Sequence, residues 1–94
     1  MADAGNANRK YTQTIKKESK TYFEALGKHI SLMRKSRGMT QAELARALGV
    51  SQQAVFAYEI GDRRISVLVL KKIARLFSTS MDALAGMATP HPAP

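Results

Sequence analysis

The sequence predicts an all-α fold, a compact bundle of five helices. Three observations lead to this prediction. Residues suited to helix N-caps stand directly before apolar residues at helical spacing, glycines follow several of these segments, and no stretch alternates apolar and polar residues as a strand would. The chain of 94 residues is long enough for one domain with a modest core. The predicted division is 1–20, a basic flexible arm or extra helix; 21–87, the helical domain; and 88–94, a disordered tail.

Residues 1–20 are polar and basic. Met1–Asn8 is rich in Ala, Asn and Gly, so we expect it to be disordered in isolation. From Tyr11 onward the apolar residues recur only weakly at helical spacing.

The first helix of the domain is predicted over Tyr22–Ser36. Thr21 and Glu24 have the spacing of a capping box, in which each side chain satisfies a backbone N–H of the other residue. Gly38 is expected to end the helix. A single apolar stripe along it predicts the buried face, comprising Phe23, Leu26, Ile30 and Met33.

A second capping box, Thr40 with Glu43, predicts a short helix over Gln41–Leu48. Gly49 should end this helix, because the position after a helix often needs a positive φ that glycine adopts without steric cost.

Ser51 is a good N-cap for the next helix, Gln52–Glu59. Val55 and Tyr58 should form its inner face, and Ala45 is small where the two helices must touch. This spacing is that of a helix-turn-helix, a motif whose second helix enters the DNA major groove.

Two further serines predict the last two helices. Ser66 should cap a helix over Val67–Phe77, and Ser80 a short helix over Met81–Ala85 that ends at Gly86. The inner face of the longer helix should carry Leu70, Ile73, Ala74 and Phe77.

Three stretches carry a family resemblance: Thr40-Gln41-x-Glu43-Leu44-Ala45, Leu48-Gly49-Val50-Ser51-Gln52-Gln53 and Tyr58-Glu59-x-Gly61. They resemble the Xre-type helix-turn-helix domain, the lambda repressor-like domain of phage repressors and Cro, over about Leu26–Ala85. The resemblance implies a sequence-specific DNA-binding transcriptional regulator, a repressor that binds an inverted-repeat operator as a homodimer. The net charge of +8 favours a polyanionic partner. Two alternatives stay open: an antitoxin that also binds its toxin, and a restriction–modification controller protein.

The outward face of the second motif helix would read the bases. Gln52 and Gln53 are similar to the paired glutamines of some lambdoid repressors, and glutamine can pair with adenine N6 and N7. Ala57 could pack on a thymine methyl group. Phe56 departs from the family pattern: it contacts thymine methyl groups or sugars if exposed, or packs internally if the helix is rotated. The predicted base-reading residues are Ser51, Gln52, Gln53, Phe56 and Ala57.

The DNA phosphates would be held by residues around this helix. Gln41 opens its helix where the free N–H groups favour an anion, and Arg63 and Arg64 follow the reading helix. The predicted phosphate contacts are Gln41, Arg63, Arg64, Lys35, Arg37 and Arg46. The resemblance also implies a structural ion pair between Arg34 and Glu59 that orients the reading helix.

The role of residues 1–20 stays open. They could lie along DNA phosphates or in a minor groove, or they could form a solvated tail or a dimerisation helix. Met81, Leu84 and Met87 could instead supply a dimer contact. If a toxin partner exists, the arm or the tail would fold on the surface of the toxin.

Several classes of protein are disfavoured by the residues that are missing. The chain has no cysteine, and only two histidines, of which His29 is expected at the surface and away from other metal ligands. No glycine-rich phosphate loop is present. We therefore predict no enzyme, no metal and no cofactor. No signal peptide or membrane-spanning stretch is visible, so a cytoplasmic protein is expected.

Overall fold

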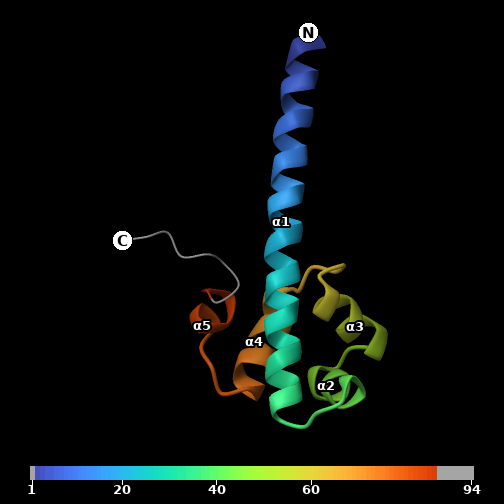
Figure 1. The fold of residues 1–94 in the computed structure, drawn as a ribbon, viewed down its shortest axis with the longest axis vertical. Helices are drawn as coiled ribbons and strands as arrows, with labels where there is room; N and C mark the ends of the chain where they lie inside the picture. Colours follow the sequence, from blue (N-terminus) through green and yellow to red (C-terminus); the bar gives the residue numbers. More distant parts are fainter. Residues whose placement is uncertain (1, 87–94) are drawn as a thin grey trace.

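The computed structural model describes the backbone of residues 2–86 and the side chains of residues 17–86. Within this part of the chain all regular structure is helical, as the sequence predicts. The C-terminal half of α1 lies against the four shorter helices, with α2 and α3 on one side of it and α5 on the other (Figure 1). The helices are α1, Ala2–Ser36; α2, Gln41–Leu48; α3, Gln52–Ile60; α4, Val67–Leu76; and α5, Met81–Gly86.

The first helix begins far earlier than predicted. It starts at Ala2, not at Tyr22, and residues 2–20 form its N-terminal part, including residues for which the composition predicts disorder. The Thr21 hydroxyl donates to the Lys17 carbonyl, 3.0 Å away, as it does inside a helix, so the predicted capping box at Thr21 is wrong. The physical reason is that a capping box can begin a helix only where the backbone before it is not already helical.

The ends of α2 follow the prediction closely. Thr40 accepts from the Glu43 N–H at 3.0 Å, while the Glu43 carboxylate accepts from the Thr40 N–H at 2.9 Å. Gly49 ends the helix at φ 72°, and the next residue, Val50, donates back to the Ala45 carbonyl. This closing pattern satisfies carbonyls that the helix end would leave unpaired.

Serine caps open the remaining helices. Ser51, Ser66 and Ser80 each accept a hydrogen bond from the backbone N–H three residues later. Gly61 closes α3 at φ 82° in the same manner as Gly49 closes α2. The observed bounds of α3, α4 and α5 differ from the predicted ones by one residue, which is within ordinary fraying.

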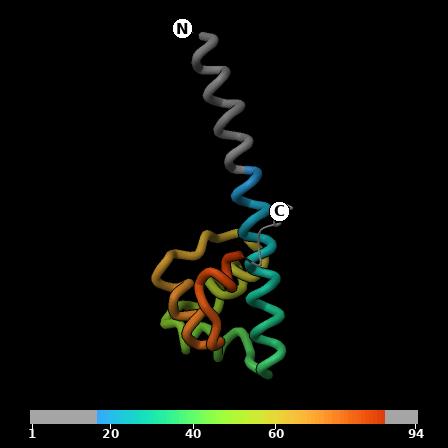
Figure 2. The backbone as a smooth tube through the Cα atoms, turned by 90° about the vertical axis from the view of Figure 1, so that its left-hand side faces the viewer, coloured from blue at the N-terminus to red at the C-terminus, as the bar shows by residue number. Residues whose placement is uncertain are grey.

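The core lies between α1 and the shorter helices. Figure 2 shows the arrangement of these helices from a second direction. The predicted inner faces are confirmed in their central residues: Leu26 and Ile30 are buried on α1, and Ile73, Ala74 and Phe77 at α4 and its C-terminal end. Leu84 is fully buried too, so it cannot supply the predicted dimer contact. Met87 and the predicted tail 88–94 lie outside the described residues.

The helices α1 and α3 approach each other unusually closely. A Cβ atom added at Gly27 would overlap the Tyr58 carbonyl oxygen and lie 2.6 Å from the Glu59 carbonyl oxygen. At the end of α3, a Cβ atom on Gly61 would lie 2.6 Å from the Glu24 Cα. Two glycines therefore set how closely α3 is seated on α1.

Candidate nucleic-acid interface

The N-terminal ends of α2 and α3 converge on one shallow hollow at the surface. It is lined by four side chains that the sequence predicts to contact DNA: Gln41, Gln52, Gln53 and Phe56. All four carry amide or aromatic groups of the kind that can meet base edges, and both helix N-termini add free backbone N–H groups. The fold thus brings residues of two helices into one surface.

The predicted base-reading residues do not all have the same access. Gln52 and Gln53 are exposed, as base reading requires. The Ser51 hydroxyl accepts from the Ala54 N–H at 3.0 Å, so it already serves as the N-cap of α3. Ala57 is half-buried and does not line the hollow. Gln52 and Gln53 are therefore the strongest candidates for polar contacts with bases.

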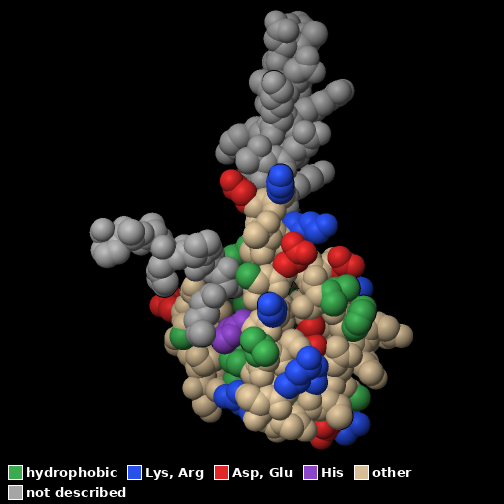
Figure 3. Space-filling model, in the orientation of Figure 1, with side chains coloured by type: hydrophobic (Ala, Val, Ile, Leu, Met, Phe, Trp, Pro, Cys, Tyr) green, Lys and Arg blue, Asp and Glu red, His purple; other side chains and the backbone are tan. Residues whose placement is uncertain are grey.

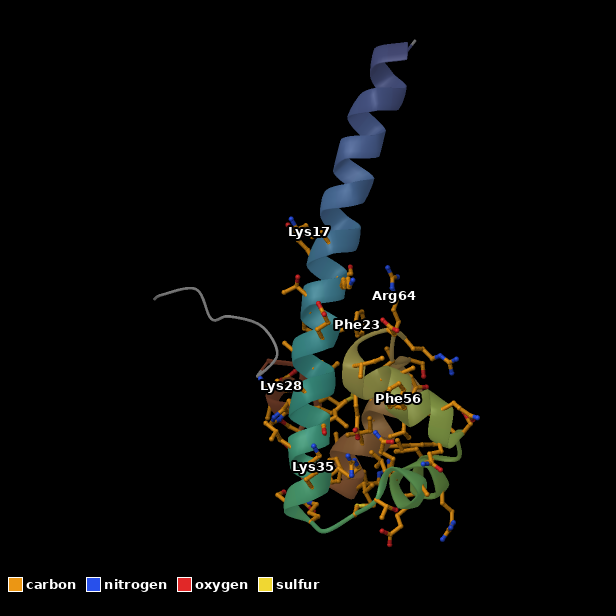
Figure 4. All side chains as sticks on the ribbon, turned by 45° about the vertical axis from the view of Figure 1, so that its right-hand side comes forward. Lys17, Phe23, Lys28, Lys35, Phe56 and Arg64 are labelled. Atoms are coloured by element: carbon orange, nitrogen blue, oxygen red, sulfur yellow. The ribbon has the colours of Figure 1, made fainter. Side chains whose placement is uncertain are left out.

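Phe56 is on the surface, not in the core. Its exposed fraction is 52 %, while Val55 and Tyr58 in the same helix are buried. Of the two arrangements that the sequence allows for Phe56, the structure has the exposed one, and Figure 4 labels the residue on α3.

The C-terminal end of α3 is fixed by a buried ion pair. Arg34 Nε donates to Glu59 Oε2 at 2.6 Å and Arg34 Nη2 donates to Glu59 Oε1 at 3.0 Å. The two side chains are only 9 % and 6 % exposed. A two-pronged contact of this kind fixes direction as well as distance. The pair joins α1 to α3, as expected for Arg34 and Glu59.

Two further hydrogen bonds extend this pair. Arg34 Nη1 donates to the Met39 carbonyl at 2.7 Å, and Gln41 Nε2 donates to Glu59 Oε1 at 3.0 Å. Burial raises the pKa of Glu59, but the hydrogen bonds from Arg34 and Gln41 outweigh it, so the pKa lies below its ordinary value. The carboxylate is thus held ionised beneath the hollow, and it anchors the Gln41 amide.

The predicted phosphate contacts are distributed around the domain. Arg63, Arg64, Lys35 and Arg46 are exposed. Figure 4 shows Arg64 beyond one end of α3 and Lys35 near the C-terminal end of α1, with Phe56 between these levels. On the face drawn in Figure 3, the described Lys and Arg side chains are spread out and interspersed with acidic ones. The basic charge therefore forms no single dense patch on that face.

Arg37 has partners that the sequence does not reveal. Its Nη2 donates to the Phe77 carbonyl at 2.9 Å, and its Cζ lies 4.6 Å from the centre of the Phe77 ring. The guanidinium thus links the C-terminal end of α1 to the C-terminal end of α4. Arg37 remains a predicted phosphate contact, although a large part of its donor capacity is used within the domain.

Sequence reasoning missed two features that bear on this surface. Gly27, which seats α3, could have been noticed as a glycine inside an amphipathic helix, where it costs about 1 kcal/mol relative to alanine. A second hollow, between α1 and the turn after α3, could not have been found, because it depends on the α1 residues that precede the predicted helix start. It is lined by Ser19, Lys20, Phe23, Gly61, Asp62 and Arg64.

No group of three or more His, Cys, Asp or Glu among the described residues is arranged to hold a metal ion. His29 on α1 is half-buried, so part of it reaches the surface, as expected. None of the helices in this part of the chain combines the length and the apolar character that crossing a bilayer requires.

The fold and the hollow together define a helix-turn-helix protein. A family model described as helix-turn-helix matches residues 30–84, more than half of the chain. The chain therefore belongs to this family of DNA-binding regulators.

Similar proteins support the family. An uncharacterised helix-turn-helix transcriptional regulator of Bacillus subtilis, YazB, is 36 % identical over 62 residues, which are 66 % of this chain and 90 % of YazB. The antitoxin PezA of Streptococcus pneumoniae is 33 % identical over 61 residues, 65 % of this chain. The match spans only 39 % of PezA.

A solved structure shows the same fold. The restriction–modification controller protein C.AhdI of Aeromonas hydrophila superimposes with a TM-score of 0.62, over 66 % of this chain and 94 % of that protein. The two sequences are 24 % identical.

Proposed function

We propose that this chain is a cytoplasmic transcriptional repressor that binds an inverted-repeat operator as a homodimer, inserting α3 into the major groove. The observation that carries the proposal is the convergence of Gln41, Gln52 and Gln53 on one exposed hollow. Glutamine amides both donate and accept, and they match the N7 acceptor and N6 donor of adenine. The role is binding, with neither catalysis nor a cofactor.

The buried ion pair supports this role from behind the surface. Arg34 and Glu59 hold the end of α3, and Glu59 in turn holds the Gln41 amide. A reading surface must be positioned by groups that do not themselves move on binding. Arg63 and Arg64, exposed just beyond α3, would then hold the flanking phosphates and fix the register.

The size of the surface supports a dimer. One short helix reads only a few base pairs, and two copies related by a two-fold axis would place their α3 helices about 34 Å apart, one turn of DNA. Because Leu84 is buried in the core, it would not take part in the contact between copies, and α1 is the longest helix that could supply it.

The test is selection of bound sequences from random duplex DNA by the full chain, at near-physiological salt and with competitor DNA. An inverted repeat of matching half-sites supports the proposal. The control is the Gln52→Ala, Gln53→Ala double variant, which should lose the motif but keep non-specific binding. Recovery of no motif by the unaltered chain would contradict sequence-specific repression.

A second candidate function is favoured by one observation, the 33 % identity to the antitoxin PezA. In that case a toxin would bind a surface outside the hollow, and the operator would still be read by α3. A restriction–modification controller is a variant of the leading proposal, since it too would bind an operator as a dimer. The likeness to C.AhdI, at 24 % identity, contributes only the fold to this variant.

A further inference from the structure

Phe56 is the apolar member of an otherwise polar hollow. Its ring lies one turn beyond Gln52 along α3 and on the same face as Gln53, and all three line the hollow together with Gln41. With an exposed fraction of 52 %, a large part of the ring meets water in the free protein. Covering exposed aromatic surface of this kind with a binding partner is favourable in free energy, because it removes apolar area from water.

The position of Phe56 is firmly set by its neighbours. Ala54 and Val55 on one side and Tyr58 on the other are buried, and the helix is capped at Ser51 and closed at Gly61. The ring is therefore exposed because it lies on the outward face of a well-anchored helix, and not because the helix frays.

Base edges in the major groove offer one group that such a ring can recognise. Thymine presents a C5-methyl group there, next to its O4 acceptor, whereas cytosine and purines present no methyl group. A phenyl ring makes no strong hydrogen bond, so it can discriminate only by contact with this apolar group. The flanking glutamine amides supply the hydrogen bonds that the ring lacks.

We infer that Phe56 is a specificity-determining residue that reads the C5-methyl group of a thymine close to a base read by Gln52 or Gln53. The inference rests on the proposed function and adds to it the chemical group that is recognised. The sequence offers both Ala57 and Phe56 for a thymine methyl contact. The inference favours the exposed Phe56 ring over Ala57, which is half-buried and outside the hollow.

Uracil substitution in the selected DNA tests this inference. Deoxyuridine removes the methyl group of thymine but keeps every hydrogen bond of the base pair. Each thymine of the half-site is replaced in turn, and the affinity of the full chain is measured for each duplex. We expect one position at which uracil weakens binding about fourfold, as expected for one buried methyl group.

Two variants assign that methyl group to a side chain. Phe56→Ala should bind the thymine and the uracil duplex with equal affinity, because the ring that senses the methyl group is gone. The matched control is Ile60→Ala, which removes another exposed apolar side chain of α3 (45 % exposed) that does not line the hollow. This control should keep the full uracil effect, and thermal unfolding verifies that both variants fold.

Three results would overturn the inference: no thymine whose replacement matters, an equal uracil effect in the chain with and without Phe56, or loss of the effect in Ile60→Ala. The last would assign the methyl group to another part of α3. Failure of the proposed function is distinct from all three, because it would appear earlier as the absence of any selected motif.

Discussion

Gly27 of α1 lies directly against the backbone carbonyl of Tyr58 on α3, with no room for a Cβ atom between them. The helix α3 is thus seated on α1 by backbone-to-backbone contact. This contact and the Arg34–Glu59 ion pair together fix how α3 lies on α1.

Gly27→Ala should destabilise the domain although alanine is the better helix former. Helix propensity favours the substitution by about 1 kcal/mol, but the added methyl group would displace the backbone of α3, and overpacking of this kind costs about 1–3 kcal/mol. Chemical denaturation measures the net loss. Gly86→Ala is the control, since a Cβ atom there meets nothing within 4 Å, and it should leave the stability nearly unchanged. Equal stability of both variants would mean that α3 shifts freely on α1.

Glu59→Gln should cost about 3 kcal/mol at neutral pH, because it leaves the buried Arg34 charge without its counter-charge. The folded-state pKa of Glu59 is lowered, so the folded state binds fewer protons than the unfolded state as the pH falls below about 4.3. The stability that Glu59 contributes is therefore complete above this pH and is lost as the pH falls through the folded pKa.

Denaturation of both proteins between pH 7 and pH 3 tests this dependence. The difference in unfolding free energy between the unaltered chain and Glu59→Gln should shrink toward acid. Glu18→Gln, which removes an exposed carboxylate of α1, is the control and should show little difference at any pH. A gap that stays constant with pH would show that the charge of Glu59 is not what stabilises the fold.

Gln52→Ala should weaken binding to the selected operator by about 1–3 kcal/mol and relax the preference at one base position. Affinities for a panel of single-base operator variants measure both effects. Binding to unrelated DNA should not change, because the side chain carries no charge. A loss of equal size on all sequences would remove Gln52 from the base readers.

Arg63→Ala and Arg64→Ala should each lower the affinity for any DNA and reduce the salt dependence of log K by roughly one unit per lost phosphate contact. Titrations between about 50 and 200 mM salt give the slope. Arg75→Ala removes another exposed arginine, on α4 and outside both hollows, and should leave the slope unchanged. If Arg75→Ala reduces the slope as much as the other two, the effect reports net charge and not position.

Local signals in the sequence predicted most of the fold. The caps at Thr40, Ser51, Ser66 and Ser80 act over three residues, so their effect can be worked out without knowledge of the remaining chain. The same reasoning failed at Thr21, because a capping pattern does not say whether the backbone before it is already helical.

The candidate site could likewise be predicted in part. The exposed glutamines follow from helical spacing, and the resemblance supplied the Arg34–Glu59 pair. The contact of Gln41 with Glu59, the seating of Gly27 and the anchoring of Arg37 on Phe77 depend on how separate helices meet. No pattern within one helix contains that information.

The nine residues of α3 form two opposite faces. One face packs against the rest of the domain, and the other is exposed at the surface. Val55 and Tyr58 face inward, whereas Gln52, Gln53 and Phe56 face outward. The outward positions can therefore change by mutation with little effect on the stability of the domain. Such a scaffold can acquire new operators in small evolutionary steps, and it offers the same freedom to an engineer who wishes to retarget it.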